Sequence, residues 1–191
     1  MNILDWLQSI DAGILLFIQE HMRIEALNGF WKAITFLGNG GWFWLVLGVA
    51  LLIPRRTRKI GLTALFSIFI CFLITNVVLK NWVARPRPYV TLSNIYPLVP
   101  KPREFSFPSG HSCVSFASAF IYYRITPKKY GIASLVLAGL ISFSRLYVGV
   151  HYPGDVLGGI LVALAGSTLA YYLMNRWFLR AERGTKQSQD V

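Results

Sequence analysis

The stretch of sequence from Ile60 to Pro88 reads IGLTALFSIFICFLITNVVLKNWVARPRP, and its character changes once along its length. The first part, from Ile60 to Leu79, contains no charged residue and is long enough to cross a membrane, which takes about 20 mostly apolar residues. The second part is basic and carries two prolines, which disfavour a continuing helix. The stretch therefore predicts a membrane-spanning helix that ends in a positively charged segment.

The composition of the whole chain also indicates a membrane protein. Of its 191 residues 54% are hydrophobic and only 14% are charged, whereas about one quarter of the residues in a typical globular protein are charged. This composition excludes a disordered chain and an ordinary soluble protein, and the length fits one compact domain. Cys71 and Cys113 lie inside apolar runs, so they indicate neither a disulfide framework nor a zinc site.

The hydrophobic pattern predicts an all-α fold, an integral membrane helical bundle of five transmembrane helices, or six if the N-terminal segment also crosses. The clear spans are 42–53 with an upstream extension to about residue 27, 60–82, 132–150 and 156–178. The segment Gly110–Ile125 is shorter and rich in Ser, and we count it as a span because the topology of its neighbours is otherwise inconsistent. The run Gly38–Gly41 predicts a kink in the first span.

The N-terminal segment Ile3–Ile18 is apolar but carries polar residues at near-helical spacing, namely Asp5, Gln8, Ser9 and Asp11. We expect an amphipathic helix that lies in the membrane interface. A cleaved signal peptide is not expected, because there is no basic leading region and no small-residue cleavage site. The predicted organisation is an amphipathic N-terminal segment (1–22), a transmembrane domain (23–180) and a polar C-terminal tail (181–191).

Basic residues predict the orientation of the chain. With five spans, 11 of the 19 Lys and Arg residues fall on one face: Arg55, Arg56, Arg58, Lys59, Arg124, Lys128, Lys129, Arg176, Arg180, Arg183 and Lys186. By the positive-inside rule this face is cytoplasmic. We therefore expect a multi-pass protein of the cell membrane with a cytoplasmic C-terminus.

Three unusual segments fall on the opposite, extracytoplasmic face. They are Lys80–Pro88 (KNWVARPRP), Phe107–His111 (FPSGH) and Ser144–Asp155 (SRLYVGVHYPGD). All three lie at ends of predicted helices that the topology brings to the same side, and together they hold two of the three histidines. Ionisable residues at a membrane boundary are costly, so their concentration here predicts a functional site.

The residue types in these segments favour phosphate binding. Pro153 is suited to the first turn of a helix, and Ser109 is suited to cap one, so two helix N-termini offer free N–H groups to an anion. Lys80, Arg87 and Arg145 add fixed positive charge, as a phosphate site requires.

The scarcity of acidic residues argues against a metal site. The chain has only 8 Asp and Glu residues, and Glu104 and Asp155 are the only two between Ala26 and Ala181. A two-metal hydrolase needs several carboxylates around its ions. We therefore expect no metal and no cofactor.

Two histidines beside a phosphate pocket predict covalent phosphoryl transfer, in which one attacks phosphorus and the other protonates the departing oxygen. If His151 and Asp155 both belong to the first turn opened by Pro153, the carboxylate can fix the imidazole tautomer. His151 is then the nucleophile and His111, by elimination, the general acid and base. Nearby cations disfavour the protonated His111 that this role needs, and we expect Glu104 to offset them.

These segments resemble the three-part signature of the type 2 phosphatidic acid phosphatase family, K-x6-R-P, P-S-G-H and S-R-x5-H-x3-D. Every signature position is matched, by Lys80, Arg87 and Pro88, by Pro108 to His111, and by Ser144, Arg145, His151 and Asp155. Arg85 and Pro86 repeat the pair Arg87 and Pro88, and spacing alone selects the second pair. The resemblance extends from about residue 28 to residue 178.

The resemblance implies a metal-independent membrane lipid phosphatase that works through a phosphohistidine. It implies that His151 is the nucleophile, that Asp155 orients it, and that His111 protonates the leaving group and later activates water. The phosphoryl oxygens would be held by Lys80, Arg87, Ser109, Gly110 and Arg145. These roles amount to positioning and electrostatic stabilisation.

The expected partner is a lipid phosphate, with undecaprenyl diphosphate as the leading substrate and phosphatidylglycerophosphate and phosphatidate as alternatives. No nucleic-acid partner is expected. Two functions of a different class stay open: an anion transporter or channel with a basic vestibule, and a non-catalytic lipid-binding protein. An assay of phosphate release distinguishes both from an enzyme.

Overall fold

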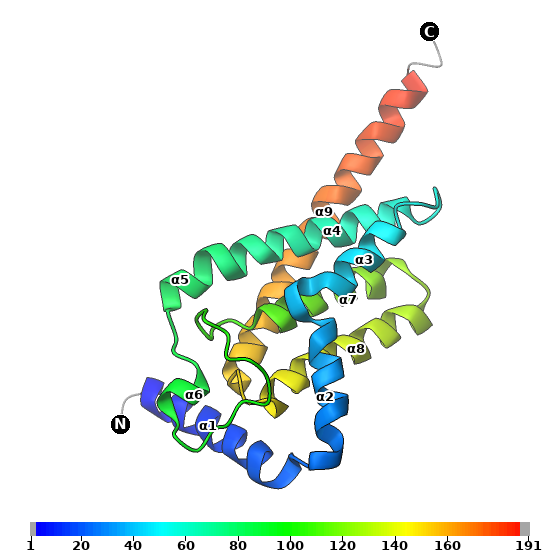
Figure 1. The fold of residues 1–191 in the computed structure, drawn as a ribbon. Coiled ribbons are helices and arrows are strands. Elements are labelled where there is room, and N and C mark those ends of the chain that lie inside the picture. Colours follow the sequence, from blue (N-terminus) through cyan, green and yellow to red (C-terminus); the bar gives the residue numbers. More distant parts are fainter. Residues whose placement is uncertain (1–2, 188–191) are drawn as a thin grey trace.

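The structure is a computed structural model that describes residues 3–187, and this part of the chain is helical without any strand. The first half forms α1 (Ile3–Phe17), the π-helical turn η1 (Ile18–Met22), α2 (Glu25–Leu37), the 3₁₀ turn η2 (Asn39–Gly41), α3 (Trp42–Ala50), α4 (Arg58–Phe72) and the π-helical segment η3 (Leu73–Leu79). The second half forms α5 (Lys80–Val83), α6 (Pro88–Thr91), α7 (Gly110–Ile125), α8 (Lys128–Tyr147) and α9 (Pro153–Gln187). Figure 1 shows their arrangement as a helical bundle.

Three helical segments of the described chain are long and apolar enough to cross a membrane. They are Arg58–Thr91, Lys128–Tyr147 and Pro153–Arg180, and the bent pair formed by α2 and α3 brings the number to four if it counts as one span. An all-helical multi-pass membrane protein is therefore confirmed. The expected total of five or six spans is not confirmed.

Helix α7 is the short, Ser-rich segment that the sequence predicts as a further span. It packs against α4, α8 and α9, and most of its residues from Ser112 to Tyr122 are buried. A helix surrounded by other helices presents little surface to lipid, so it can carry polar residues such as Ser112, Ser115 and Ser118. Its 16 residues rise only about 24 Å, less than the hydrocarbon core of a typical bilayer.

Small residues bring the helices around α7 into close contact. A Cβ atom on Gly159 would lie 2.6 Å from the carbonyl oxygen of Ser109, and one on Gly166 would lie 2.5 Å from the Sγ atom of Cys71. Ala163 is fully buried in the same interface. Gly159 and Ala163, four residues apart, therefore allow the helices to approach closely, and Cys71 and Cys113 are free and buried.

The first span is broken where the glycine run predicts a kink. Helices α2 and α3 are bent by 46° relative to one another, and the break contains Gly40 at φ 58° and Gly41 at φ 71°. Backbone in this left-handed region favours glycine, because a Cβ atom would be strained there. The break lies beside the start of α7.

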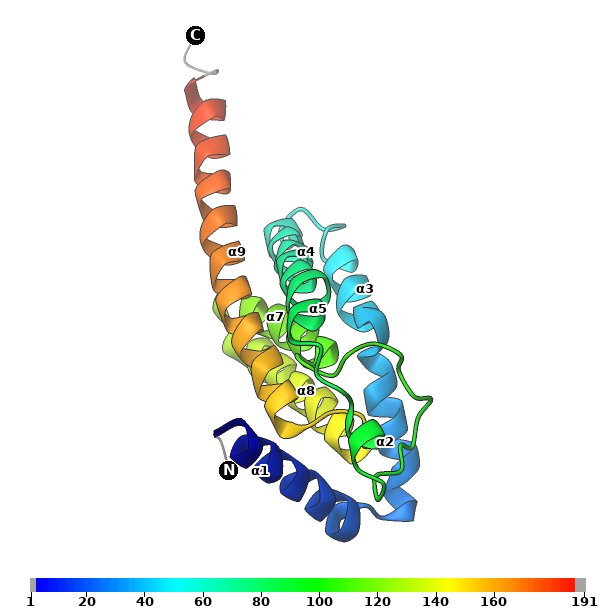
Figure 2. The same ribbon diagram turned by 90° about the vertical axis from the view of Figure 1, so that its left-hand side faces the viewer.

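The two ends of the chain differ in their relation to the bundle. Helix α1 lies across one end of it, beside the start of α9 (Figure 2). It exposes a set of apolar side chains: Ile3, Trp6, Leu7, Ile10, Ile14 and Phe17. Helix α9 continues through residue 187, into the segment 181–191 where the sequence predicts a polar tail. Residues 188–191 of that tail lie outside the described part of the chain.

Candidate active site

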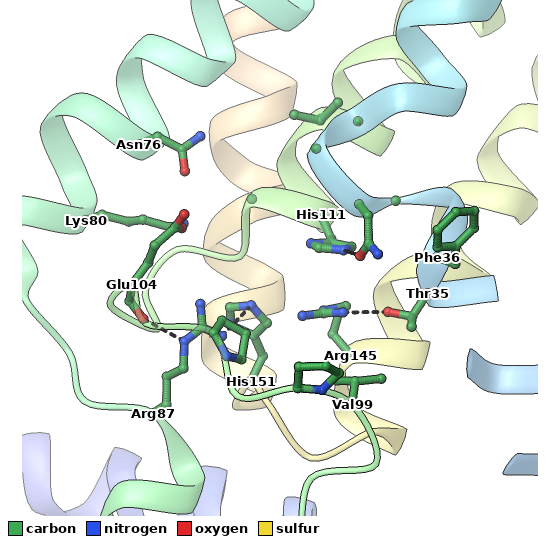
Figure 3. A pocket seen from close by; sticks show the side chains of 18 of the residues that line it. Thr35, Phe36, Asn76, Lys80, Arg87, Val99, Glu104, His111, Arg145 and His151 are labelled. Atoms are coloured by element: carbon green, nitrogen blue, oxygen red, sulfur yellow. Dashed lines mark hydrogen bonds and ion pairs between the residues drawn. The ribbon is translucent and has the colours of Figure 1, made fainter. Parts of the chain in front are cut away.

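A cavity of about 780 Å³ lies where several helix ends and turns of the bundle meet. Its walls come from α2, the break η2, the end of α4 with η3 and α5, the loop 98–104, the start of α7, the end of α8 and the turn before α9. Figure 3 shows that the labelled polar side chains converge on this space from different elements. The cavity therefore collects residues that are far apart in the sequence.

His151 lies in the turn between α8 and α9 and is only 2% exposed. Its Nδ1 atom is 3.3 Å from Oδ2 of Asp155. Its Nε2 atom is 3.3 Å from Nη1 of Arg87 (Figure 3). Arg87 can only donate, so Nε2 accepts and the ring proton belongs on Nδ1, where it is donated to Asp155. This tautomer leaves the lone pair on Nε2, beside Arg87, which also lines the cavity.

Burial sets the charge of His151. It lowers the pKa of His151 from 6.5 to about 4, although the hydrogen bond to Asp155 acts in the opposite direction. The imidazole is therefore neutral at pH 7. A neutral imidazole is the form that can act as a nucleophile.

Asp155 is fully buried behind His151, in the first turn of α9. Besides His151 it accepts hydrogen bonds from the backbone N–H of Tyr152 at 2.8 Å, from the hydroxyl of Ser106, and from Nη1 of Arg85 at 2.8 Å. Four donors and no acceptor surround its carboxyl group, which favours the ionised form. Asp155 can therefore hold the ring and stabilise positive charge on it.

The local backbone explains how His151 and Asp155 meet. Helix α9 begins at Pro153, as the sequence predicts, but His151 precedes the helix, so the expectation that both residues lie in its first turn is wrong. A positive φ of 77° at Gly149 turns the chain after α8. The N–H of Ser109 also donates to the carbonyl of Asp155 at 2.9 Å, which fastens the start of α7 to the start of α9.

Three buried cations surround the cavity. Arg87 donates to the carbonyl groups of Glu104 at 2.6 Å and Val150 at 2.9 Å, which fixes its guanidinium beside His151. Arg145, at the end of α8, donates from Nη1 to the hydroxyl of Thr35 at 2.6 Å, while its Nε atom is buried without a partner among the described residues. With Lys80 these side chains give the cavity an excess of positive charge suited to a phosphoryl group.

Glu104 is the carboxylate that faces this cluster. Its side chain, 67% exposed, forms an ion pair with Lys80, and this hydrogen bond lowers the pKa of Glu104 below its ordinary value. The sequence led us to expect that Glu104 supports His111. In the structure the Glu104 carboxylate instead pairs with Lys80, and the imidazole of His111 is hydrogen-bonded to Asn39.

The start of α7 brings His111 and Gly110 to the cavity wall. Ser109 caps this helix, as predicted: its hydroxyl accepts the N–H of Ser112, at 3.4 Å. The Ser109 side chain is buried and does not line the cavity, so its contribution is to the helix start. The Nε2 atom of His111 is 2.9 Å from Oδ1 of Asn39, in the break between α2 and α3.

The structure therefore brings together most of the residues singled out in the sequence. Lys80, Arg87, Gly110, His111, Arg145 and His151 line one cavity, whereas Asp155 and Ser109 lie behind its wall.

Sequence reasoning missed several supporting residues. The spacing of the signature selects Arg87 and not Arg85 for the phosphate site. Arg85 nevertheless binds Asp155 at 2.8 Å and Asp11 of α1 at 2.7 Å. The repeated Arg-Pro pair and the placement of an acid on α1 were the available signals. No pattern marked Ser106 or Asn39.

The described residues contain no group of three or more His, Cys, Asp or Glu side chains placed to hold a metal ion. A helical membrane protein that gathers two histidines and three buried cations around one cavity has the make-up of a phosphatase set in a membrane. The sequence profile described as the PAP2 superfamily matches residues 60–179, which is more than half of the chain. The chain belongs to this superfamily, whose phosphatases hydrolyse lipid phosphates.

Three proteins that are similar to this chain are named as phosphatases. The undecaprenyl-diphosphatase of Sulfolobus acidocaldarius is 37% identical over 158 residues, which cover 81% of this chain and 75% of the relative. Phosphatidylglycerophosphatase B of Bacillus subtilis is 35% identical over 173 residues, covering 82% and 79%. The crystal structure of a transmembrane PAP2-type phosphatidylglycerolphosphate phosphatase from Bacillus subtilis superposes with a TM-score of 0.72 at 33% identity, covering 89% of this chain and 87% of that chain.

Proposed function

We propose that this protein removes the terminal phosphate from a lipid phosphate or diphosphate through a covalent phosphohistidine on His151. The observation that carries the proposal is the placement of the His151 ring between Asp155 and Arg87 at the cavity wall. This placement favours the tautomer that carries its proton on Nδ1 and its lone pair on Nε2, beside the cations that would hold a phosphoryl group.

In the first step the Nε2 lone pair of His151 attacks phosphorus and forms an N–P bond. The P–O bond to the lipid breaks at the same time, and the proton of His111 goes to the departing oxygen. The phosphorylated ring becomes positively charged, and the Asp155 carboxylate beside Nδ1 stabilises that charge. The lipid alcohol or lipid monophosphate then leaves.

In the second step His111, now neutral, takes a proton from water while the water oxygen attacks phosphorus. The N–P bond breaks, its electron pair returns to Nε2 of His151, and inorganic phosphate is released. Lys80, Arg87, Arg145 and the N–H groups at Gly110 stabilise the negative charge on the phosphoryl oxygens in both steps. Ser109 contributes by holding the helix start.

This mechanism uses fixed cations where other phosphatases use metal ions, so we propose that the activity is metal-independent. The charge of the cavity supports this proposal, because three buried cations face one exposed carboxylate. Cationic side chains can neutralise a transferring phosphoryl group in place of divalent ions.

The substrate we propose first is undecaprenyl diphosphate, followed by phosphatidylglycerophosphate and phosphatidate. Phe36 of α2 and Phe72 of α4 both line the cavity and are about half exposed, so they offer an apolar path for a lipid tail beside the polar site. Relatives named undecaprenyl-diphosphatase support this order, as does an outward-facing site, where the diphosphate carrier is released.

We propose five spans: the bent pair α2 and α3, the continuous segment α4 to α5, and α7, α8 and α9. The turns after α3 and α7 lie at the end of the bundle away from α1 and carry basic residues such as Arg56 and Lys128 (Figure 1). The positive-inside rule then gives an extracytoplasmic active site and a cytoplasmic C-terminus. Residues 1–22 form the interfacial segment, 23–180 the phosphatase domain and 181–191 the tail.

Phosphate release from purified protein in detergent tests the function. Wild type and His151→Ala are compared on the three candidate lipids in the presence of EDTA. We expect turnover that resists the chelator and disappears with His151, and the relative rates rank the lipids. Loss of wild-type activity in EDTA would contradict metal independence, and no release from any lipid would favour a transporter or binding protein.

A further inference from the structure

Asn39 gives His111 its hydrogen-bond partner across a long stretch of sequence. The two residues are 72 positions apart, and Oδ1 of Asn39 lies 2.9 Å from Nε2 of His111 at the cavity wall. An amide oxygen can accept an N–H from the imidazole in its neutral or its charged form. Asn39 therefore contacts the ring that the proposed mechanism uses as its acid.

The glycines on either side of Asn39 let the backbone approach α7 closely. A Cβ atom on Gly38 would lie 2.6 Å from Cδ2 of His111, and one on Gly41 would lie 2.7 Å from Cγ1 of Val114. Side chains at these positions would push the turn away from α7. The glycine run thus places Asn39 against His111, in addition to bending the first span.

The break is also fastened on both sides. Before it, Thr35 of α2 accepts a hydrogen bond from the buried guanidinium of Arg145. After it, the indole Nε1 of Trp44 in α3 donates to Ser115 of α7 at 2.9 Å. Both anchors lie within five residues of Asn39, so its position relative to His111 is determined by packed elements.

We propose that Asn39 is a positioning residue that acts through His111: it orients the imidazole and accepts an N–H of its protonated form. Lys80, Arg87 and Arg145 surround the cavity and oppose positive charge on His111, and the amide oxygen supplies a compensating acceptor. This inference rests on the proposed function, because it concerns protonation of the leaving group in that reaction.

The leaving group provides the test. An alkyl phosphate releases a strongly basic alkoxide that needs an acid, whereas an alkylphenyl phosphate of matched chain length releases a phenolate, which needs less help. The value of kcat/KM on each ester is measured for wild type, Asn39→Ala, Asn39→Asp, His111→Gln and Asn76→Ala. Asn76 is the matched control, because it lines the same cavity beside Gly110 and Lys80.

Asn39→Ala is expected to lose about 10- to 100-fold in kcat/KM on the alkyl ester, the range for a hydrogen bond to a charged group, and much less on the alkylphenyl ester. The ratio kcat/KM is used because it covers only the steps through departure of the leaving group, and not the later hydrolysis of the phosphohistidine. His111→Gln shows the same preference more strongly. Asn39→Asp keeps a hydrogen-bond acceptor, so its ratio of the two kcat/KM values stays near that of wild type. Asn76→Ala changes both values by the same factor.

An equal loss on both esters in Asn39→Ala would mean a general structural defect and would overturn the proposal, as would no loss at all. If wild type cleaves neither ester, the proposed function itself fails and this inference fails with it. If wild type and His111→Gln behave as expected but Asn39→Ala does not discriminate, only the inference is wrong.

Discussion

At the scale of single residues, the two nitrogens of His151 meet opposite kinds of neighbour. Asp155 accepts from Nδ1 and Arg87 donates to Nε2, so the surroundings fix both the tautomer and the direction of the lone pair. The carboxylate is itself held by Ser106, Tyr152 and Arg85. A change at Asp155 should therefore alter the chemistry more than the binding of phosphate.

Asp155→Asn should lower kcat by a factor on the order of 10² to 10⁴, because the amide cannot stabilise a charged ring and can select the wrong tautomer. The inhibition constant of inorganic phosphate should change little. Steady-state kinetics measure both quantities. Ser106→Ala is the matched control, since it removes one donor but keeps the charge of Asp155, and a loss as large as that of Asp155→Asn would contradict the assignment.

Burial of His151 predicts an unusual titration. In the free protein its imidazole should titrate near pH 4, well below the ordinary 6.5, and ¹⁵N NMR of labelled histidine in detergent can follow it. Between these two values the unfolded chain binds a proton that the folded chain excludes, so acidification in this window lowers the free energy of unfolding. A midpoint near 6.5 would show that the ring is not desolvated.

At the scale of elements, α1 contacts residues that surround the Asp155 carboxylate. Asp11 accepts the backbone N–H of Gly154 at 2.8 Å and pairs with Arg85, which in turn binds Asp155. The guanidinium of Arg85 also stacks over the ring of Tyr152, 4.1 Å from its centroid. Helix α1 therefore reinforces the start of α9 from behind the cavity.

Asp11→Asn should reduce kcat about 3- to 30-fold with little change in KM, because Arg85 loses an anionic partner while the cavity stays intact. Ser9→Ala is the control on the same helix, since the Ser9 hydroxyl donates to the carbonyl of Trp6 within α1 and not to the cavity residues that the structure describes. Kinetics on one lipid in detergent compare the two variants. Equal effects of both variants would indicate that α1 matters only for the fold.

The positions of the helices explain which site residues can be predicted from the sequence and which cannot. Lys80, Arg87, His111 and His151 could be assigned to one site, because each lies at a helix end and the spans alternate in direction. Asn39, Arg85 and Asp11 could not, since their contacts depend on which helix faces which. The Ser-rich α7 looked weak as a span because other helices cover it.

At the scale of the whole molecule, the charge pattern predicts which end of the bundle faces the cytoplasm. The native Cys71 and Cys113 are buried, so an introduced cysteine reports its own side of the membrane. In intact cells a membrane-impermeant maleimide should label Ser93→Cys, in the loop before the cavity, but should label Arg56→Cys only after permeabilisation. The reverse pattern would place the active site on the cytoplasmic face.

The covalent intermediate on His151 is the central claim, and trapping it is the most direct test. His111→Gln should still be phosphorylated by an alkylphenyl phosphate, because phenolate leaves without much help, but should hydrolyse the intermediate slowly. Mass spectrometry after a rapid alkaline quench should find one phosphoryl group on His151, and none in the His111→Gln/His151→Gln double variant. Phosphate release without any phosphorylated His151 would contradict the account. Activity retained in His151→Gln would contradict it as well.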